Sequence, residues 1–216
     1  SLSDISHQLK TPLTSIIIIL DNILDNPDME QTVREDFIKD IKREITNIQF
    51  LVANLLKLSK LDANSVQFIN KEVKVEEIIQ NVVKNVSSIC DLKNIKINIT
   101  GDLKAKIVCD ERWQIEAITN IVKNAAEHSK TDSEIDISYE QNKAYTKVAI
   151  KDYGAGISNS DIKHIFQRFY KSKNSAKDSI GIGLPLAKSI IERNNGYIEV
   201  TSEEGKGTTF TIKYLK

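Results

Sequence analysis

The sequence contains residue types that can bind a phosphate and transfer it, and they lie in separate segments. His7, near the N-terminus, carries an imidazole that can act as a nucleophile. Asn120 and Asn124 stand at i and i+4 within a helical pattern, so their amides project from one helix face. Amide oxygens are hard ligands that suit Mg²⁺ beside phosphate oxygens. Taken alone, the pair would be better interpreted as two solvated asparagines.

Two glycine-containing segments add to this set. Asp152-Tyr153-Gly154-Ala155-Gly156 follows a predicted strand, where a carboxylate can accept a hydrogen bond from an exocyclic amine such as that of adenine, and where glycine lets the backbone approach a ligand. An ordinary turn is the alternative interpretation. Gly181-Ile182-Gly183-Leu184 runs into a helix, and backbone amides at such a helix start form a phosphate cradle. Pro185 in the first helical turn is compatible with this.

An aromatic cluster that carries two cations lies between the glycine segments. We expect Phe166 and Phe169 to pack in the core, whereas Arg168 and Lys171 remain available to neutralise a γ-phosphate. The polar stretch 172–180 that follows has the composition of a mobile lid.

Apolar residues recur at helical spacing in two N-terminal segments, which predicts two long helices joined by a short loop at Asn26-Pro27. One such hairpin cannot cover its own apolar stripe, so pairing with a second copy into a four-helix bundle is the economical solution. His7 falls opposite the stripe of the first helix, which centres between Ile5, Leu9, Leu13 and Ile16. We therefore expect His7 to face solvent, on the same face as Thr11, Thr14 and Ile18.

Beyond residues 61–65 the helical periodicity breaks, and we place a domain boundary there, between residues 1–64 and 65–216. The second part alternates between strand-like and helix-like stretches, which predicts an α/β sandwich of one mixed sheet covered by helices; with the hairpin the fold class is α+β. The predicted strands are 66–69, 95–100, 106–109, 135–140, 146–151, 197–201 and 208–214. The predicted helices are 75–89, 111–128, 160–165 and 184–194.

Composition excludes several classes of protein. Lys plus Arg equals Asp plus Glu at 30 each, so no strong field favours nucleic acid or an anionic membrane. The two cysteines lack metal-ligand spacing, which fits a reducing cytosol. The longest apolar run, Ile16 to Leu20, is far too short to cross a bilayer. Because the first residue is Ser1 and it opens into a helical pattern, we interpret the chain as part of something longer.

The string Ser6-His7-Gln8-Leu9-Lys10-Thr11-Pro12-Leu13-Thr14 resembles the H box of bacterial two-component sensor histidine kinases. The resemblance implies that His7 attacks the γ-phosphate of ATP. The family usually has Glu or Asp where this chain has Gln8, and an amide can orient the ring but cannot take its proton. Thr11 matches the polar residue that helps position water for dephosphorylating the partner, so phosphatase activity is compatible with the sequence.

In their order, the later segments resemble the N box, the glycine boxes and the F box of the histidine-kinase ATP-binding domain. The resemblance implies that Asn124 coordinates Mg²⁺, that Asn120 supports the phosphates of ATP, and that Asp152 binds the adenine amine with Thr208 nearby. It implies that Gly181 and Gly183 shape the phosphate end of the lid. His128 stands where the family often has Tyr or His, and both a binding role and a packing role remain open.

The resemblance further implies a homodimer that passes its phosphoryl group to an aspartate of a response-regulator receiver domain, within a cytoplasmic module of a membrane-anchored parent. One alternative is a catalytically weak, nucleotide-binding dimeric scaffold or phosphatase, which Gln8 supports. A second is an ATPase of the gyrase, mismatch-repair and chaperone branch of the same fold, which has no use for an exposed histidine in an S-H-x-L-K-T-P helix. The G-x-x-x-x-G-K-[ST] loop of P-loop enzymes is absent from the sequence.

Overall fold

The computed structural model describes residues 2–172 and 181–216, and the predicted lid lies almost wholly outside them. The chain divides into two compact units, residues 1–57 and residues 58–216. The division falls within the second helix, whereas the boundary expected from the sequence lies at residue 64. Each unit is a separate body in the description that follows.

Two long helices make up the first unit: α1 (Leu2–Asp25) and most of α2 (Gln31–Asp62). The turn between them is closed by a hydrogen bond from the Met29 amide to the Asn26 carbonyl, so both helices and the loop agree with the sequence pattern. Many apolar side chains of the hairpin stay exposed, and Leu13, which was expected at the centre of the buried stripe, is 48% exposed. A single hairpin therefore leaves apolar surface uncovered, as its sequence indicates.

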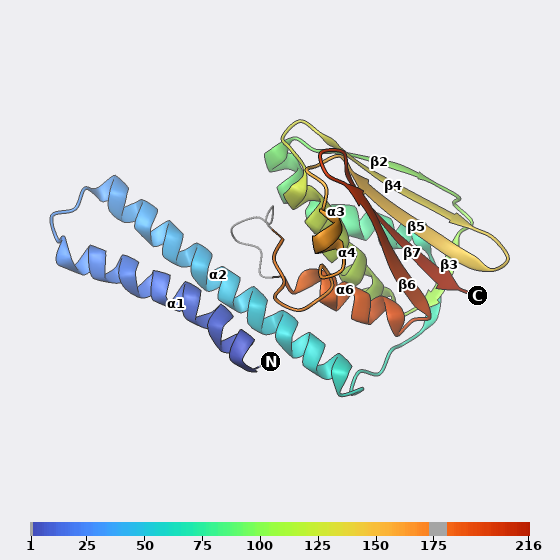
Figure 1. The fold of residues 1–216 in the computed structure, drawn as a ribbon, viewed down its shortest axis with the longest axis horizontal. Coiled ribbons are helices and arrows are strands. Elements are labelled where there is room, and N and C mark those ends of the chain that lie inside the picture. The colour runs from blue at the N-terminus through green and yellow to red at the C-terminus, as the bar shows by residue number, and fades with distance from the viewer. Residues whose placement is uncertain (1, 173–180) are drawn as a thin grey trace. The chain divides into compact units, whose positions relative to one another are not determined.

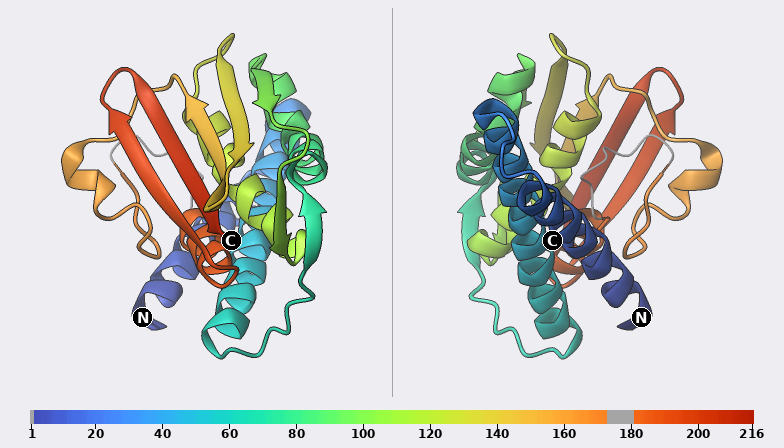
Figure 2. Two further views of the ribbon diagram at one scale, coloured as in Figure 1. Left: turned by 90° about the vertical axis from the view of Figure 1, so that its right-hand side faces the viewer. Right: turned by 90° about the vertical axis from the view of Figure 1, so that its left-hand side faces the viewer.

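The second unit is a layer of helices on one face of a sheet (Figures 1 and 2). Its helices are α3 (Val75–Lys93), α4 (Glu111–His128), α5 (Asn159–Ile162) and α6 (Gly183–Glu192). Its strands are β1 (Lys71–Lys74), β2 (Lys96–Gly101), β3 (Lys106–Cys109), β4 (Glu134–Gln141), β5 (Tyr145–Asp152), β6 (Gly196–Glu203) and β7 (Gly207–Leu215). The main sheet has the order β2-β4-β5-β7-β6, with β2 and β4 parallel and the other neighbours antiparallel.

Alternation along the central strands builds the core. In β5, Val148 and Ile150 are fully buried, and in β7 so are Phe210 and Ile212. Because side chains of a strand alternate between faces, these residues point to the helix side. The helices contribute buried apolar residues at helical spacing to the same core, such as Ile118 and Ile121 in α4 and Leu186 and Ile190 in α6.

Three sequence expectations differ from the structure. The strand expected at 66–69 is absent, and the first strand is Lys71–Lys74. This strand pairs antiparallel with β3 in a separate two-stranded sheet, so the unit does not have one sheet alone. Pairing with β3 and burial of Val73 decide the position of β1, although V-Q-F-I is the more apolar string. The helix expected at 160–165 is confined to Asn159–Ile162.

Side chains hold both ends of helix α4: Asp110, just before the helix, at its start, and Lys93 of α3 at its end. At its start, Asp110 accepts a hydrogen bond from the Trp113 amide at 3.3 Å and another from the Ile69 amide at 2.9 Å. At its end, the Lys93 ammonium donates to the carbonyl oxygens of Ala126, Glu127 and Ser129 at 2.8–2.9 Å. These are carbonyls that a helix end leaves without partners, and a cation there also suits the helix dipole.

We predict that Lys93→Ala lowers the free energy of unfolding by about 1–3 kcal/mol, the range for hydrogen bonds to a charged group. The loss follows because the carbonyls at the end of α4 lose a shared donor. Urea unfolding followed by circular dichroism measures it. Lys84→Ala, at an exposed position of the same helix α3, is the matched control and should change stability little. Equal losses in the two variants would contradict a capping role.

Candidate functional site

The carboxyl group of Asp152 lies at the end of β5 and is 3% exposed. Its Oδ1 accepts hydrogen bonds from the backbone amides of Gly154, at 2.9 Å, and Thr208, at 3.3 Å. Among the described residues, Oδ2 has no hydrogen-bond donor. A buried carboxylate with a free acceptor atom suits an incoming N–H donor such as an amine on a base.

Burial raises the pKa of Asp152 above its usual value, because removal from water disfavours the charged form. The hydrogen bonds from Gly154 and Thr208 and the nearby imidazole of His128 act in the opposite direction, and burial outweighs them. The site thus holds a carboxyl group that lacks solvation before a ligand arrives. A ligand that donates a hydrogen bond to this carboxyl group would compensate part of the free-energy cost of removing it from water.

Close backbone approaches around Asp152 explain three of the glycines. A Cβ at Gly154 would collide with the carbonyl oxygen of His128, the last residue of α4. A Cβ at Gly207, whose φ is +115°, would collide with the carbonyl oxygen of Asp152 itself. Gly156 is packed in the same way against the carbonyl of Glu203. The glycine segments therefore bring the end of α4, the end of β5 and the start of β7 together.

Helix α4 supplies the asparagines. Asn120 is buried, and its Nδ2 donates to the Glu116 carbonyl at 3.0 Å, which leaves Oδ1 directed at the start of α6. A Cβ at Gly183 would lie 3.1 Å from this Oδ1. Asn124 is half-buried, and among the residues that the structure describes its side-chain amide has no hydrogen-bond partner. The i and i+4 spacing thus places Asn120 against α6 and leaves the side-chain amide of Asn124 free to contact a ligand.

The start of α6 presents uncapped amides. Ile182 occupies the N-cap position and provides no side-chain hydrogen bond, so within residues 2–172 and 181–216 the amides of Gly183 and Leu184 have no intrahelical or capping partner. Pro185 is buried in the first turn and replaces an amide that would have had no helical partner. Together with Asn120, this helix start provides the environment in which anions bind to proteins.

The cations of the aromatic cluster are placed differently from each other. Arg168 donates to both carboxylate oxygens of Asp62, at 2.9 and 2.7 Å, and is thus held by an ion pair. Lys171 is exposed. Phe166 packs edge-on against Phe210 with ring centroids 6.4 Å apart, as expected of a core residue. The structure therefore gives Arg168 a partner that the sequence did not indicate.

Both ends of the segment expected to form a lid are tied together. The Phe169 amide donates to the Gly181 carbonyl at 2.8 Å, and Gly181 adopts a φ of +73°. A Cβ at Gly181 would collide with the Tyr170 carbonyl, so glycine is required at this junction. Residues 173–180, the bulk of the expected lid, are outside the described residues.

The sequence did not predict the structural role of Ser202. Ser202 in β6 accepts a hydrogen bond from the Ile157 amide at 2.8 Å, donates to the Gly207 carbonyl at 2.9 Å, and lies 2.8 Å from the Thr208 hydroxyl. It thereby joins β6 to the segment after Asp152 and to Thr208. A serine in a strand gives no sequence signal for this role, because its contacts depend on how β6 pairs with β7 and on Ile157, which lies 45 residues earlier in the chain.

In the first unit, α1 carries His7 on its exposed face. Thr11, Thr14 and Ile18 are exposed on the same face, with Ile18 at 55%, so the predicted orientation is confirmed. The Thr11 hydroxyl donates to the His7 carbonyl at 3.3 Å, and Gln8 is half-buried. Pro12 lies just over one turn after His7 and lacks an amide proton. The Gln8 carbonyl therefore has no helical donor.

Two family models match the chain. Residues 109–216 match the family described as "Histidine kinase-, DNA gyrase B-, and HSP90-like ATPase". Residues 1–64 match the "His Kinase A (phospho-acceptor) domain". The first match contains Asn120, Asn124, Asp152 and Thr208, and the second contains His7.

Curated relatives resemble nearly the whole chain. The "Heme sensor protein HssS" of Staphylococcus saprophyticus is 33% identical over 214 residues, which are 99% of this chain and 45% of that protein. The "Sensor-like histidine kinase SenX3" of Mycobacterium tuberculosis is 28% identical over 213 residues, 97% of this chain and 52% of that protein. The chain spans about half the length of these relatives.

Solved structures show the same fold at low sequence identity. The Acinetobacter baumannii histidine kinase AdeS aligns with a TM-score of 0.80 and 22% identity, and the alignment covers 97% of each chain. The histidine kinase ThkA, solved in complex with the response regulator protein TrrA, aligns with a TM-score of 0.81 and 20% identity over 100% of this chain and 60% of that one. The predicted architecture of a helical hairpin followed by a mixed-sheet α/β unit is confirmed.

We predict that Asp152→Asn gains stability relative to the wild type as the pH rises. The pKa of Asp152 is higher in the folded state, so the stability that this carboxyl contributes is present below the unfolded-state pKa of 3.8 and is lost as the pH rises through the folded-state pKa. An amide carries no such charge. Urea midpoints of the nucleotide-free proteins between pH 3.8 and neutrality measure the difference.

Glu204→Gln removes a carboxylate at an exposed position and is the matched control for this series. Its midpoint should follow that of the wild type more closely than Asp152→Asn does. An Asp152→Asn variant that loses stability relative to the wild type as the pH rises would show that the ionised carboxylate stabilises the fold.

Proposed function

The chain belongs to the histidine kinase-, DNA gyrase B- and HSP90-like ATPase family and joins to it the phospho-acceptor domain of histidine kinases, and we propose that it uses ATP to phosphorylate its own His7. The phosphoryl group then passes to an aspartate of a response regulator. The observation that carries this proposal is the exposure of His7 on α1, within a matched phospho-acceptor domain, alongside a complete set of nucleotide-binding motifs in the second unit. This combination also disfavours the gyrase and chaperone branch of the family.

The second unit binds the substrate ATP in this proposal. Asp152 Oδ2 accepts a hydrogen bond from the adenine amine, which its lack of a donor among the described residues supports. The amides of Gly183 and Leu184 point at the phosphates, with Asn120 beside them. His128, Gly154, Gly156 and Thr208 shape the base pocket around Asp152. Gly181 and Lys171 border the phosphate end.

Asn124 fits a Mg²⁺ ion that accompanies the nucleotide. Its side-chain amide is half-buried and has no hydrogen-bond partner within the described residues, which leaves its oxygen free as a hard ligand. Mg²⁺ commonly takes only one or two protein ligands beside phosphates and water, so a single amide is sufficient. When bound, the ion neutralises charge that develops on the phosphates.

The chemical step forms a bond between an imidazole nitrogen of His7 and the γ-phosphorus of ATP while the bond from that phosphorus to the β,γ-bridging oxygen breaks, and ADP leaves. The exposure of His7 gives the nucleophile access to a phosphate. The other ring nitrogen needs a hydrogen-bond acceptor, and the Gln8 amide oxygen can orient the ring without accepting its proton. We infer that Gln8 slows the reaction and does not abolish it.

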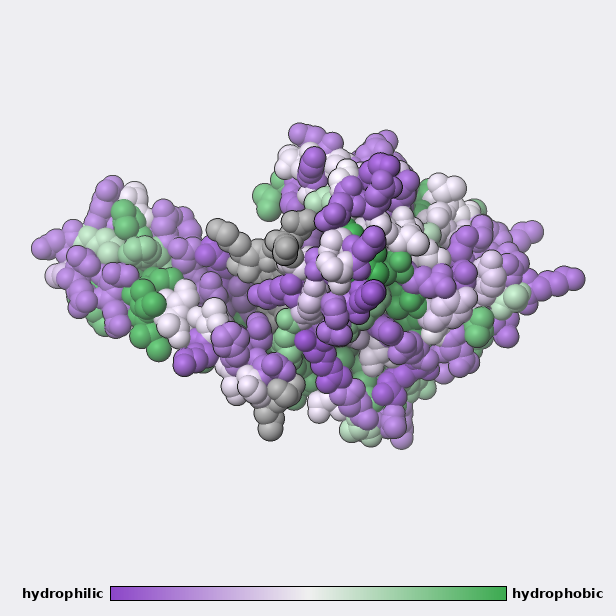
Figure 3. Space-filling view, in the orientation of Figure 1, coloured by the Kyte–Doolittle hydropathy of each residue, from purple (hydrophilic) through white to green (hydrophobic). Residues whose placement is uncertain are grey.

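The hairpin is proposed to form a four-helix bundle with a second copy of the chain. Apolar side chains lie exposed along both helices, including Ile17, Leu20 and Leu24 of α1 and Val33 and Ile38 of α2. Figure 3 shows apolar surface on this hairpin. Burial of such a stripe against an identical stripe removes it from water in both copies.

The partner is proposed to be a receiver domain that docks beside His7 and Ile18, two exposed residues on one face of α1. The structure of ThkA with a response regulator protein supports this class of partner. Among the described residues, no helix is long and apolar enough to span a membrane. We propose that the chain is the cytoplasmic module of a membrane-anchored sensor, since its relatives are about twice as long and are named as sensors.

We predict that γ-labelled ATP with Mg²⁺ transfers label to the chain, and that the label is acid-labile and alkali-stable, as expected of phosphohistidine. His7→Ala removes the nucleophile and Asn124→Ala removes the metal ligand, so both should reduce incorporation to background. His164→Ala changes a half-buried histidine of the second unit that has no role in this proposal; it is the matched control and should retain labelling.

The alternative of a nucleotide-binding scaffold or phosphatase rests on Gln8 alone and makes a different prediction. In that case the chain binds ATP without acquiring label, and Gln8→Glu, which restores a carboxylate, rescues incorporation. Label that persists in His7→Ala would contradict the kinase proposal, because another residue would then be the acceptor.

We predict that Asp62→Asn raises the labelling rate at sub-saturating ATP by up to about fivefold. Arg168 must leave Asp62 to neutralise a γ-phosphate, and a half-exposed ion pair of this kind is worth about 0–1 kcal/mol. Arg168→Ala should lower the labelling rate. In the double variant, adding Asp62→Asn to Arg168→Ala should not change that rate further. Additive effects of the two changes would show that Asp62 acts on something other than Arg168.

A further inference from the structure

An open cavity of about 960 Å³ lies in the second unit, away from the candidate nucleotide site. Thr146 of β5 and Tyr214 of β7 line it and are paired with each other in the sheet. Asp152 and Thr208 are paired at the other end of the same two strands. At about 3.3 Å per residue, the two ends of β5 are roughly 20 Å apart. The cavity is therefore a separate feature of the domain.

Buried, hydrogen-bonded side chains line this cavity or lie directly behind its lining. The Tyr214 hydroxyl donates to Gln114 at 2.6 Å, and Gln114 in turn donates to Asn194 at 2.7 Å. Thr146 is 1% exposed and donates to the Lys106 carbonyl at 2.8 Å. Because these buried polar groups are paired within the protein, the lining keeps its shape without a ligand.

Positive charge is concentrated in the lining. Five cationic residues contribute to it: Lys74, Lys104, Lys106, Arg193 and Lys216. Glu72 is the carboxylate residue among the lining residues, and Lys106 already pairs with it at 2.6 Å. Within the described part of the chain, the side-chain ammonium groups of Lys74 and Lys104 have no carboxylate partner, although the Lys104 backbone amide donates to Asp102 at 2.9 Å. Since the whole chain has a formal net charge of zero, this cavity is a local positive region that attracts anions.

Apolar side chains lie beside these cations. Leu103, Val108 and Leu215 all line the cavity and are 62%, 66% and 56% exposed. A small inorganic anion would meet the lysines and leave these three side chains in water. An occupant with an apolar body would cover them, which removes apolar surface from water.

We propose that this cavity binds an amphipathic organic anion, in which a carboxylate meets Lys74 and Lys104 and an aliphatic body covers Leu103, Val108 and Leu215. The volume is within the range of small-molecule sites, and the mixture of an apolar surface with a few convergent polar groups is typical of such sites. The ligand is recognised by charge and by apolar area, and its binding does not depend on nucleotide.

Methyl-labelled NMR of the full chain with octanoate as the probe tests the proposal. Saturable shifts are expected at the methyl groups of Leu103, Ile107, Val108 and Leu215. Neither 1-octanol, which lacks the charge, nor acetate, which lacks the apolar body, should produce saturable shifts there. The proposal would be overturned if 1-octanol or acetate shifted these methyl groups as much as octanoate does. It would also be overturned if the octanoate shifts were confined to α1 and α2.

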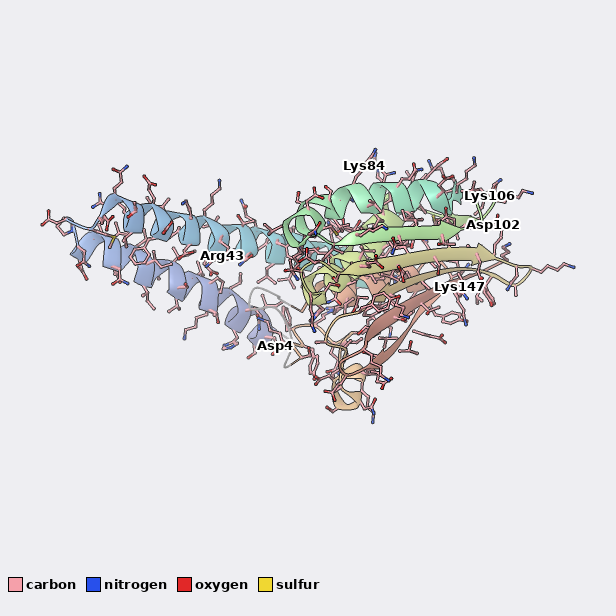
Figure 4. All side chains as sticks on the ribbon, turned by 90° about the horizontal axis from the view of Figure 1, so that it is seen from above. Asp4, Arg43, Lys84, Asp102, Lys106 and Lys147 are labelled. Carbon is pink, nitrogen blue, oxygen red and sulfur yellow. The ribbon has the colours of Figure 1, made fainter. Side chains whose placement is uncertain are left out.

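Charge-reversal variants provide the second arm. Lys74→Glu with Lys104→Glu should weaken octanoate binding roughly tenfold or more, as expected when charge-assisted hydrogen bonds are lost. Leu103→Gln, in an exposed turn, should weaken binding through the apolar contact and guards against a folding defect of the double variant. Lys84→Glu is the matched control, because Lys84 lies on α3 outside the cavity lining, apart from the lining residue Lys106 of β3 (Figure 4). Unchanged affinity in the double variant would overturn the proposal.

Discussion

The buried carboxyl group of Asp152 is the constraint on which the rest of the second unit depends. A charged group at 3% exposure is tolerated only where the surroundings supply hydrogen bonds, and here they come from two segments distant in the chain, through the amides of Gly154 and Thr208. Those amides reach Asp152 only because Gly154 and Gly207 allow backbone to pass close to backbone. The proposed recognition of a base and the local fold therefore depend on the same contacts.

Helix α4 connects this site to the rest of the domain. Its first turn begins at the Asp110 cap and contains the buried Gln114, which is hydrogen-bonded to Tyr214 and Asn194 in the lining of the distant cavity. Its last turn ends at His128, whose carbonyl lies against Gly154 and whose neighbours are held by Lys93. One rigid element therefore carries the asparagines and is anchored at both ends by polar contacts. Its position along its own axis is fixed before any ligand binds.

Sequence reasoning predicted the helical hairpin, the bounds of α4 and β3, and the exposed face of His7, because periodicity and capping are local properties. It also brought Asn120 and Gly183 into one site through motif order. It missed the pairing of β1 with β3 and the ion pair between Arg168 and Asp62, whose partners are 106 residues apart. It likewise missed Ser202 and Lys93. These roles arise from tertiary contacts between residues that have no spacing rule in common.

The parallel pairing of β2 with β4 has a consequence for the order of folding. Parallel neighbours cannot be joined by a tight turn, and the chain between β2 and β4 contains β3 and all of α4. Long-range pairing of this kind forms late, because the closure entropy of the intervening chain must be overcome first. β2 is also an edge strand, with one neighbour in the sheet and mostly exposed side chains. Its amides should consequently exchange with deuterium through a local opening that leaves β5, β7 and the carboxyl of Asp152 in place.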